Sequence, residues 1–213
     1  MSRNFTQSLR LVADGLACIR GGRVVFEGLS FSVSGGEALV VTGPNGAGKS
    51  SLIRQIAGLV DVAGGTLALE GGAADATIAE EAHYIGHLDA LKPSMSVRET
   101  ASLWADFFGG GDAGGALQAF DLDTLADLPV AYLSAGQRRR LALSRLLVAP
   151  RPLWLLDEPS VALDAASFAR LVVLMEAHLA QGGIVVAATH QPLGLARVSP
   201  LDLSSVRQRM VSA

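Results

Sequence analysis

Short apolar runs alternate with glycine-rich turns along the chain, a pattern typical of a domain that mixes strands and helices. Three of the runs are apolar apart from Thr42 and are bordered by Pro or Gly, at residues 38–42, 153–156 and 184–188. Strands buried on both faces of a parallel sheet have this composition. We therefore predict an α/β fold built on a parallel sheet, with a helix over 49–59 directly after the first strand.

Segments of alternating polarity surround this pattern and indicate a second kind of sheet. Residues 24–26, 29–33 and 66–70 alternate apolar and polar side chains near glycines, which favours an antiparallel patch flanking the parallel strands. From 87 to 133 the strand signals vanish and helical spacing returns, as in 97–108, until the glycine-rich stretch after it. We expect an inserted helical subdomain there.

Composition restricts the class of protein. The chain has 213 residues, half of them apolar, which suffices for one sizeable core but not for two full enzymatic domains. No run approaches the roughly 18 uninterrupted apolar residues of a membrane span, and the polar residues 1–7 lack the features of a signal peptide, so we expect a cytoplasmic protein. The lone Cys18 is expected to be a small buried apolar side chain. The net charge of −3 disfavours nucleic acid as a partner, and the one basic run, 138–140, is expected to be a solvated helix face.

A glycine-rich turn between the first buried strand and its helix carries the strongest chemical signal. Residues 43–50 read GPNGAGKS and fit GxxxxGK[ST], which lets backbone N–H groups face a phosphate at a helix N-terminus. Lys49 is predicted to reach the β and γ phosphates of ATP, and the Ser50 hydroxyl to ligate Mg²⁺. The alternative is a turn without function. The predicted nucleotide-binding residues of this segment are Gly43, Pro44, Asn45, Gly46, Ala47, Gly48, Lys49, Ser50 and Ser51.

An acidic pair follows the second buried strand. Asp157 and Glu158 come directly after residues 153–156, where the carboxyl end of a parallel strand would bring them toward the glycine-rich turn. We predict that Asp157 holds Mg²⁺ and that Glu158 polarises the attacking water as general base. The alternative is that both residues only cap a following helix.

A third motif connects the chain to a family. Residues 133–137 read LSAGQ and precede a helical pattern over 138–148, with Ser134 as a natural N-cap. With the glycine-rich turn before it and the acidic pair after it, this motif resembles the signature LSGGQ of the ABC ATPase family, with Ala135 in place of the first glycine. The resemblance implies that Ser134, Gly136 and Gln137 contact an ATP held by a second ATP-binding subunit, so that a head-to-tail dimer encloses two ATP.

Two further stretches resemble the same family. Residues 159–164 look like its dimer-contacting loop, and His190 follows the last buried strand as the family's switch histidine does, which implies a γ-phosphate contact; a capped core histidine is the alternative. The resemblance covers most of residues 10–195. The implied organisation is a single ABC ATPase domain over 1–213, with a nucleotide-binding core of about 8–86 and 150–195 and a helical subdomain of about 87–149.

Two positions depart from the family pattern. Most members carry a Gln on the loop that enters the helical subdomain, and the nearest equivalent here is His87. An imidazole forms one hydrogen bond as an amide does but changes charge near neutral pH, so coupling would be pH-sensitive unless His87 is a loop residue without a role. Arg20 stands where the family places an aromatic residue against adenine; its planar guanidinium also stacks, which leaves base selectivity open.

The chain resembles the ATP-binding subunits of bacterial cytochrome c maturation (haem-export) transporters. The features that carry this resemblance are its short length, these two departures and the segments 20–23, 86–92 and 189–193. This resemblance implies a membrane-embedded partner subunit and a peripheral location at the cytoplasmic face of the inner membrane. No residue points to haem itself. The alternative is a soluble ABC ATPase of DNA repair, translation or cluster assembly. The sequence has no long heptad insertion, no tandem second cassette and no basic surface signal, and each of these absences disfavours that alternative.

Overall fold

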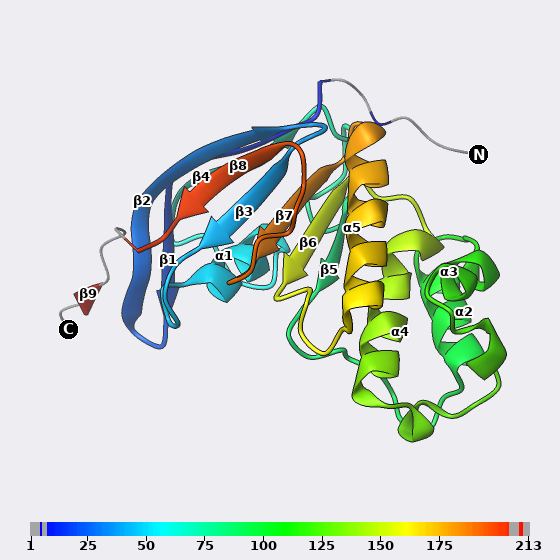
Figure 1. The fold of residues 1–213 in the computed structure, drawn as a ribbon. Coiled ribbons are helices and arrows are strands. Elements are labelled where there is room, and N and C mark those ends of the chain that lie inside the picture. The colour runs from blue at the N-terminus through cyan, green and yellow to red at the C-terminus, as the bar shows by residue number, and fades with distance from the viewer. Residues whose placement is uncertain (1–4, 6–7, 205–208, 211–213) are drawn as a thin grey trace. The chain divides into compact units, whose positions relative to one another are not determined.

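The structure is a computed structural model that describes residue 5, residues 8–204 and the backbone of residues 209–210 (Figure 1). Residues 1–4 and 6–7 belong to the segment 1–7, which is not expected to be a signal peptide, and they lie outside this description. The chain divides into two compact units, and the helical one also takes in residues 160–174, which the family resemblance assigns to the nucleotide-binding core. The first unit comprises Met1–Gly86, Pro152–Pro159 and Met175–Ala213, and the second His87–Arg151 and Ser160–Leu174.

A five-stranded parallel sheet forms the centre of the first unit, in the order β5-β6-β7-β3-β8. Its three adjacent inner strands are the three predicted from continuous apolar runs, and every residue of β6 and β7 is buried. The α/β fold class is therefore confirmed. The strands are β3 (Ala38–Thr42), β5 (Ala82–Ile85), β6 (Leu153–Asp157), β7 (Ile184–Ala188) and β8 (Val198–Asp202), and α1 (Lys49–Ile56) follows β3.

A curved antiparallel sheet in the order β4-β1-β2-β9 accompanies the parallel one (Figure 1). The long β1–β2 hairpin turns at Gly21 and Gly22, and the register of β1 shifts between Ala13 and Leu16. This irregularity hides the alternation of β1 from sequence inspection, whereas the predicted segments 24–33 and 66–70 fall within β2 and β4. The strands are β1 (Arg10–Arg20), β2 (Arg23–Ser34), β4 (Gly64–Glu70) and β9 (Arg209–Met210).

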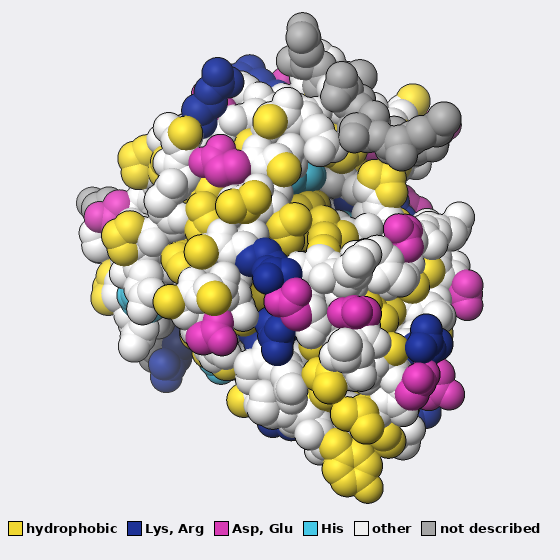
Figure 2. Space-filling model, turned by 45° about the vertical axis from the view of Figure 1, so that its right-hand side comes forward, with side chains coloured by type: hydrophobic (Ala, Val, Ile, Leu, Met, Phe, Trp, Pro, Cys, Tyr) yellow, Lys and Arg dark blue, Asp and Glu magenta, His cyan; other side chains and the backbone are white. Residues whose placement is uncertain are grey.

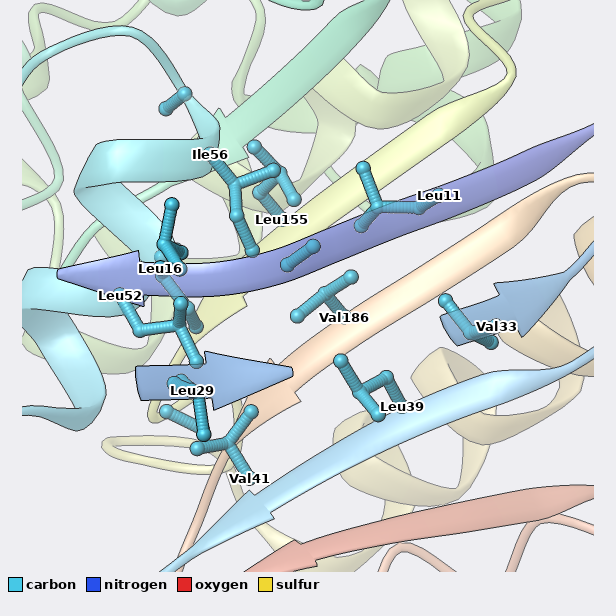
Figure 3. Packing of buried hydrophobic residues seen from close by; sticks show 14 of the residues in the cluster. Leu11, Leu16, Leu29, Val33, Leu39, Val41, Leu52, Ile56, Leu155 and Val186 are labelled. Carbon is cyan, nitrogen blue, oxygen red and sulfur yellow. The ribbon is translucent and has the colours of Figure 1, made fainter. Parts of the chain in front are cut away.

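The apolar core of this unit lies between the two sheets and around α1. Figure 3 shows side chains of β1 and β2 directed toward those of β3, β6, β7 and α1. Each fully buried Leu or Ile contributes about 2 kcal/mol by leaving water, so this cluster is the main source of stability for the unit. Its labelled members are Leu11, Leu16, Leu29, Val33, Leu39, Val41, Leu52, Ile56, Leu155 and Val186.

The second unit is built from capped helices. Ser96 and Ser134 each form a capping box, with Glu99 and Gln137 respectively, so that both helices begin where the sequence predicts. The glycine-rich interruption after α2 is shorter than expected, because Asp112 accepts a hydrogen bond from Gly115 N–H at 2.8 Å and starts another helix. The helices are α2 (Val97–Phe107), α3 (Ala113–Ala119), α4 (Ala135–Val148) and the two short 3₁₀ turns Asp123–Leu125 and Val130–Tyr132; α5 (Ala165–Ala180) has residues in both units.

The expectation that residues 138–140 form a solvated basic face is wrong. Arg139 is only 3% exposed, and the guanidinium groups of Arg138 and Arg140 donate to the backbone carbonyls of Leu133 and Phe120 at 2.6 and 2.9 Å. Successive helical residues point about 100° apart, so the three arginines spread over about 200° of the helix, and the middle one, Arg139, points into the protein.

Two other expectations from composition can be compared with the structure. Cys18 is fully buried, as predicted. Within the part of the chain that the structure describes, no helix is both long and apolar enough to cross a bilayer. On the face in Figure 2, Lys and Arg side chains are interspersed with Asp and Glu, so positive charge is not gathered there into one broad area.

His178, near the end of α5, is buried in the first unit against two aromatic rings. Its ring stacks on Trp154 at a centroid distance of 4.1 Å and meets the edge of Phe5 at 5.4 Å. Its Nε2 lies 3.2 Å from the Pro152 carbonyl and 3.3 Å from the Ile184 carbonyl, and because carbonyls only accept, Nε2 carries the hydrogen. Burial lowers the pKa of His178 from 6.5 to about 4, so the ring is neutral in the folded protein.

We predict that the first unit loses stability in mild acid through His178. His178 takes up a proton near pH 6.5 in the unfolded chain but only near pH 4 in the folded chain. The stability that the neutral ring contributes is therefore fully present above pH 6.5, and the free energy of unfolding falls between pH 6.5 and 4, by about 3 kcal/mol in total. Urea unfolding at several pH values measures it. His178→Gln keeps a donor for the carbonyls and should flatten the decline, whereas His87→Gln, at an exposed histidine, should not; equal slopes in parent and His178→Gln would contradict the assignment.

Candidate functional site

A hollow of about 420 Å³ opens in the first unit beside the glycine-rich turn. The turn connects β3 to α1, so backbone N–H groups and the N-terminus of α1 border the hollow. Its volume falls in the range of small-ligand sites. The lining residues are Arg20, Val25, Asn45, Gly46, Gly48, Lys49, Ser50, Ser51, Glu158 and His190.

Close packing holds the turn against strand β2. Gly48 has φ +103°, and a Cβ at this position would lie 2.7 Å from Val25 Cγ1 and 3.1 Å from Phe26 Cδ1. Glycine is therefore required at residue 48 both by the backbone conformation and by the space available. Gly46 shares the left-handed conformation, with φ +84°, but no atom lies within 4 Å of its added Cβ.

Lys49 is the central cation of the hollow and is 7% exposed. Its Nζ donates hydrogen bonds to the carbonyls of Gly43 at 2.8 Å and Pro44 at 3.2 Å, two residues of the turn itself. The ammonium group is thus held over the turn by the same backbone that would surround a phosphate.

A hydroxyl and a carboxylate meet beside this lysine. Ser50, in the first turn of α1, donates from Oγ to Asp157 Oδ1 at 2.9 Å, and Asp157, at the end of β6, is 1% exposed. The contact joins residues that are 107 positions apart, which requires β3 and β6 to end at the same edge of the parallel sheet. Both predicted metal ligands therefore lie together.

Glu158 and His190 complete the edge of the hollow. Glu158 has φ +50°, a left-handed conformation that is unfavourable for a side-chain-bearing residue, and its N–H donates to the Ala188 carbonyl at 2.9 Å. His190 Nε2 lies 3.2 Å from Lys49 Nζ and 3.4 Å from Glu158 Oε1. Because the ammonium group only donates, Nε2 accepts from Lys49 when it has no hydrogen and can donate to Glu158 only when it has one.

Arg20, at the end of β1, also lines the hollow, as the sequence interpretation expected. None of the lining residues is Phe, Tyr or Trp, whereas Arg20 supplies a planar guanidinium and Val25 an apolar side chain. Sequence inspection missed Val25, because an apolar residue in an alternating strand carries no sign of facing a ligand.

Four further predicted site residues, Ser134, Gly136, Gln137 and His87, belong to the second unit. Ser134 Oγ accepts from Gln137 N–H at 3.2 Å, while Gln137 Oε1 accepts from Ser134 N–H at 2.7 Å, so both side chains shape the N-terminus of α4. A Cβ at Gly136 would lie 3.1 Å from the Ala162 carbonyl, so this corner of the helix is closely covered by the loop that follows the acidic pair. His87 is exposed at the start of the unit.

Comparison with known sequences identifies the family. A model described as ABC transporter matches residues 26–161. The cytochrome c biogenesis ATP-binding export protein CcmA of Nitrobacter winogradskyi is 56% identical over 190 residues, which cover 88% of this chain and 95% of that protein. The protein of the same name from Chelativorans sp. is 50% identical over 200 residues, 92% of this chain and 99% of the relative. The chain belongs to the ABC transporter family. It is an ATP-binding and ATP-hydrolysing member of that family.

Solved structures agree with this family's fold. The structure of the ATP binding subunit of an ABC transporter has a TM-score of 0.80 and 24% identity, covering 94% of this chain and 90% of its own. A dimeric ATP-binding cassette in a post-hydrolysis state, bound to ADP and Pi, has a TM-score of 0.78 and 21% identity, covering 95% of this chain and 99% of its own. These similarities establish the ABC nucleotide-binding fold.

We predict unequal effects of alanine at two glycines of the turn. Gly46→Ala meets no neighbouring atom and should lose only the conformational term, about 1 kcal/mol of unfolding free energy. Gly48→Ala adds an overlap with Val25 and Phe26 and should lose about 2 kcal/mol more. Denaturant unfolding without nucleotide measures both variants, and equal losses would contradict the packing described here.

Proposed function

We propose that this ATPase is the ATP-hydrolysing subunit of a haem-export transporter of cytochrome c maturation. It would act at the cytoplasmic face of the bacterial inner membrane, bound to a membrane-embedded partner subunit. The support comes from relatives named as cytochrome c biogenesis export proteins, which are 50 and 56% identical over nearly their whole length. This similarity favours export over the soluble alternatives in DNA repair, translation or cluster assembly.

In the proposed site, the glycine-rich turn and Lys49 hold the phosphates of ATP. Backbone N–H groups of the glycine-rich turn and the N-terminus of α1 supply positive potential, and Lys49 supplies a full charge. The lysine exchanges its hydrogen bonds to the turn carbonyls for bonds to the β and γ phosphates. Arg20 lies against the base, with Val25 beside it.

The donor set of Ser50 and Asp157 fits Mg²⁺. This ion prefers hard oxygen ligands, takes few of them from protein and completes its shell with water and phosphate oxygens. A hydroxyl and a buried carboxylate already 2.9 Å apart match that preference. When bound, the ion would supply charge neutralisation at the β and γ phosphates.

Glu158 is the proposed general base and His190 the proposed γ-phosphate contact. The Glu158 carboxylate is 21% exposed at the hollow's edge, where it would accept a proton from the attacking water. His190 lies between this carboxylate and Lys49, with Nε2 close to both. An N–H on its ring would therefore face the negative charge that develops on the transferred phosphoryl group.

The corner at the start of α4 is proposed to act on a second subunit's nucleotide. Ser134, Gly136 and Gln137 form a capped helix N-terminus without a lysine of its own, a feature suited to a phosphate that another site already holds. Two copies arranged head to tail would then enclose two Mg-ATP. His87 is proposed to take the place of the family's glutamine at the start of the helical unit.

We predict that Glu158→Gln separates binding from turnover. The amide keeps the shape but cannot take the proton, so steady-state ATP hydrolysis should fall by roughly 10²-fold or more while ATP affinity is retained. Lys49→Ala is the matched variant and should lose ATP binding itself, as measured by titration calorimetry. Parental turnover in Glu158→Gln, or parental ATP affinity in Lys49→Ala, would contradict the assigned roles.

We predict that the tagged chain, isolated from detergent-solubilised bacterial membranes, brings with it an integral protein of the cytochrome c maturation pathway. Mass spectrometry identifies the partner. A strain that lacks the chain should lose haem-stained c-type cytochromes and regain them with the parent but not with Glu158→Gln. Recovery of soluble or nucleic-acid partners alone, with normal c-type cytochromes in the deletion strain, would contradict the transport role.

A further inference from the structure

Arg139 is the buried charge of the second unit that the proposed chemistry does not use. Its side chain is 3% exposed, and NH1 lies 3.1 Å from Asp89 Oδ1, whose side chain is 25% exposed. A hydrogen bond between two charged groups in such a poorly hydrated place is stronger and more directional than one at the surface. Arg139 thereby attaches helix α4 to a segment 50 residues earlier in the chain.

That segment is the loop that leaves β5 and leads to α2. Asp89 stands two residues after His87, and the next residue, Ala90, has φ +52°. An alanine in the left-handed region costs roughly 1 kcal/mol, and such a residue persists where surrounding contacts fix the backbone. The ion pair to Arg139 is one contact of this kind.

The far end of the same loop is also held next to α4. Ala131 N–H donates to the Pro93 carbonyl at 3.1 Å, and Val130 N–H donates to the Met95 carbonyl at 2.9 Å. Residues 130–131 lie directly before Leu133 and Ser134, where α4 is capped. The loop is therefore attached at one end to the first turns of α4 and at the other to the residues that lead into that helix.

We infer that the Asp89–Arg139 ion pair is a positioning device that makes the loop carrying His87 and the capped start of α4 one rigid body. This rests on the proposed function, in which Ser134, Gly136 and Gln137 complete a second subunit's nucleotide site. Arg139 touches no nucleotide. It fixes the position of the serine-glycine corner relative to the loop by which the helical unit is joined to β5, so that a displacement of either is transmitted to the other.

Neighbouring Arg140 provides the matched control. It extends from the same helix and donates to the Phe120 carbonyl at 2.9 Å, with a more distant ion pair to Asp121 at 4.0 Å. Its partners therefore lie at the end of α3 and not on the loop. Removing Arg140 tests the stability of the helical unit without releasing residues 87–92.

The test compares turnover with nucleotide affinity in the whole chain. Asp89→Asn weakens the pair, and the double variant Asp89→Leu/Arg139→Met removes both charges, a replacement that is often neutral or stabilising for buried pairs. We expect kcat for ATP hydrolysis to fall about tenfold or more in both, because misplacement of a group needed only in the closed state acts on turnover. KM and ATP affinity should stay within about twofold, since the glycine-rich turn is unchanged. Asp89→Glu keeps a carboxylate opposite Arg139 and should therefore retain most of the parental kcat.

Three outcomes overturn the inference: a folded double variant with parental kcat, a rise in KM with unchanged kcat, or an equal fall in kcat for Arg140→Gln at equal loss of stability. Thermal unfolding of each variant supplies the stability comparison. If the parent itself binds and hydrolyses no ATP, the proposed function fails. If the parent hydrolyses ATP and the ion-pair variants hydrolyse it at the parental rate, only the inference fails.

Discussion

Packing between the antiparallel sheet and the glycine-rich turn that leads into α1 fixes where a phosphate could be bound. Gly48 rests on Val25 and Phe26 of β2, so the backbone of the glycine-rich turn is positioned by an apolar surface behind it and not by polar contacts alone. From that position Lys49 and Ser50 point toward the carboxyl ends of β6 and β7, where Asp157, Glu158 and His190 follow. The position of this edge therefore depends on an apolar surface behind the turn that includes Phe26, which is fully buried.

The parts of the fold that sequence alone predicted are those with strong local signals. The three inner strands of the parallel sheet are almost entirely apolar because both faces are covered, and the N-cap of α4 at Ser134 directly precedes a helical pattern. The missed strands lack such signals. The shift of register near Gly15 interrupts β1, β5 has only four residues, and β8 is half exposed and contains Pro200.

The same distinction applies to the site. Asp157 and Glu158 could be placed beside the glycine-rich turn because parallel strands end at one edge of the sheet. Arg139 was misjudged because its partner, Asp89, is distant in sequence and neither residue has a local feature that indicates pairing. Val25 was overlooked because it lines the hollow only through the close approach of the glycine-rich turn to β2, a contact between segments that are distant in sequence. Local patterns thus identified the chemical groups, and tertiary structure decided which supporting residues hold them.

The left-handed backbone at Glu158 has a consequence for how this position can vary. Glycine would adopt φ +50° without penalty, so the fold by itself would gain about 1 kcal/mol from losing the glutamate side chain. Glu158 therefore places a carboxylate in a backbone conformation that disfavours side chains, immediately after a strand whose every residue is buried. Variants selected only for resistance to heat should therefore drift toward glycine here, and a stabilised form of the protein obtained in that way would lack the proposed general base.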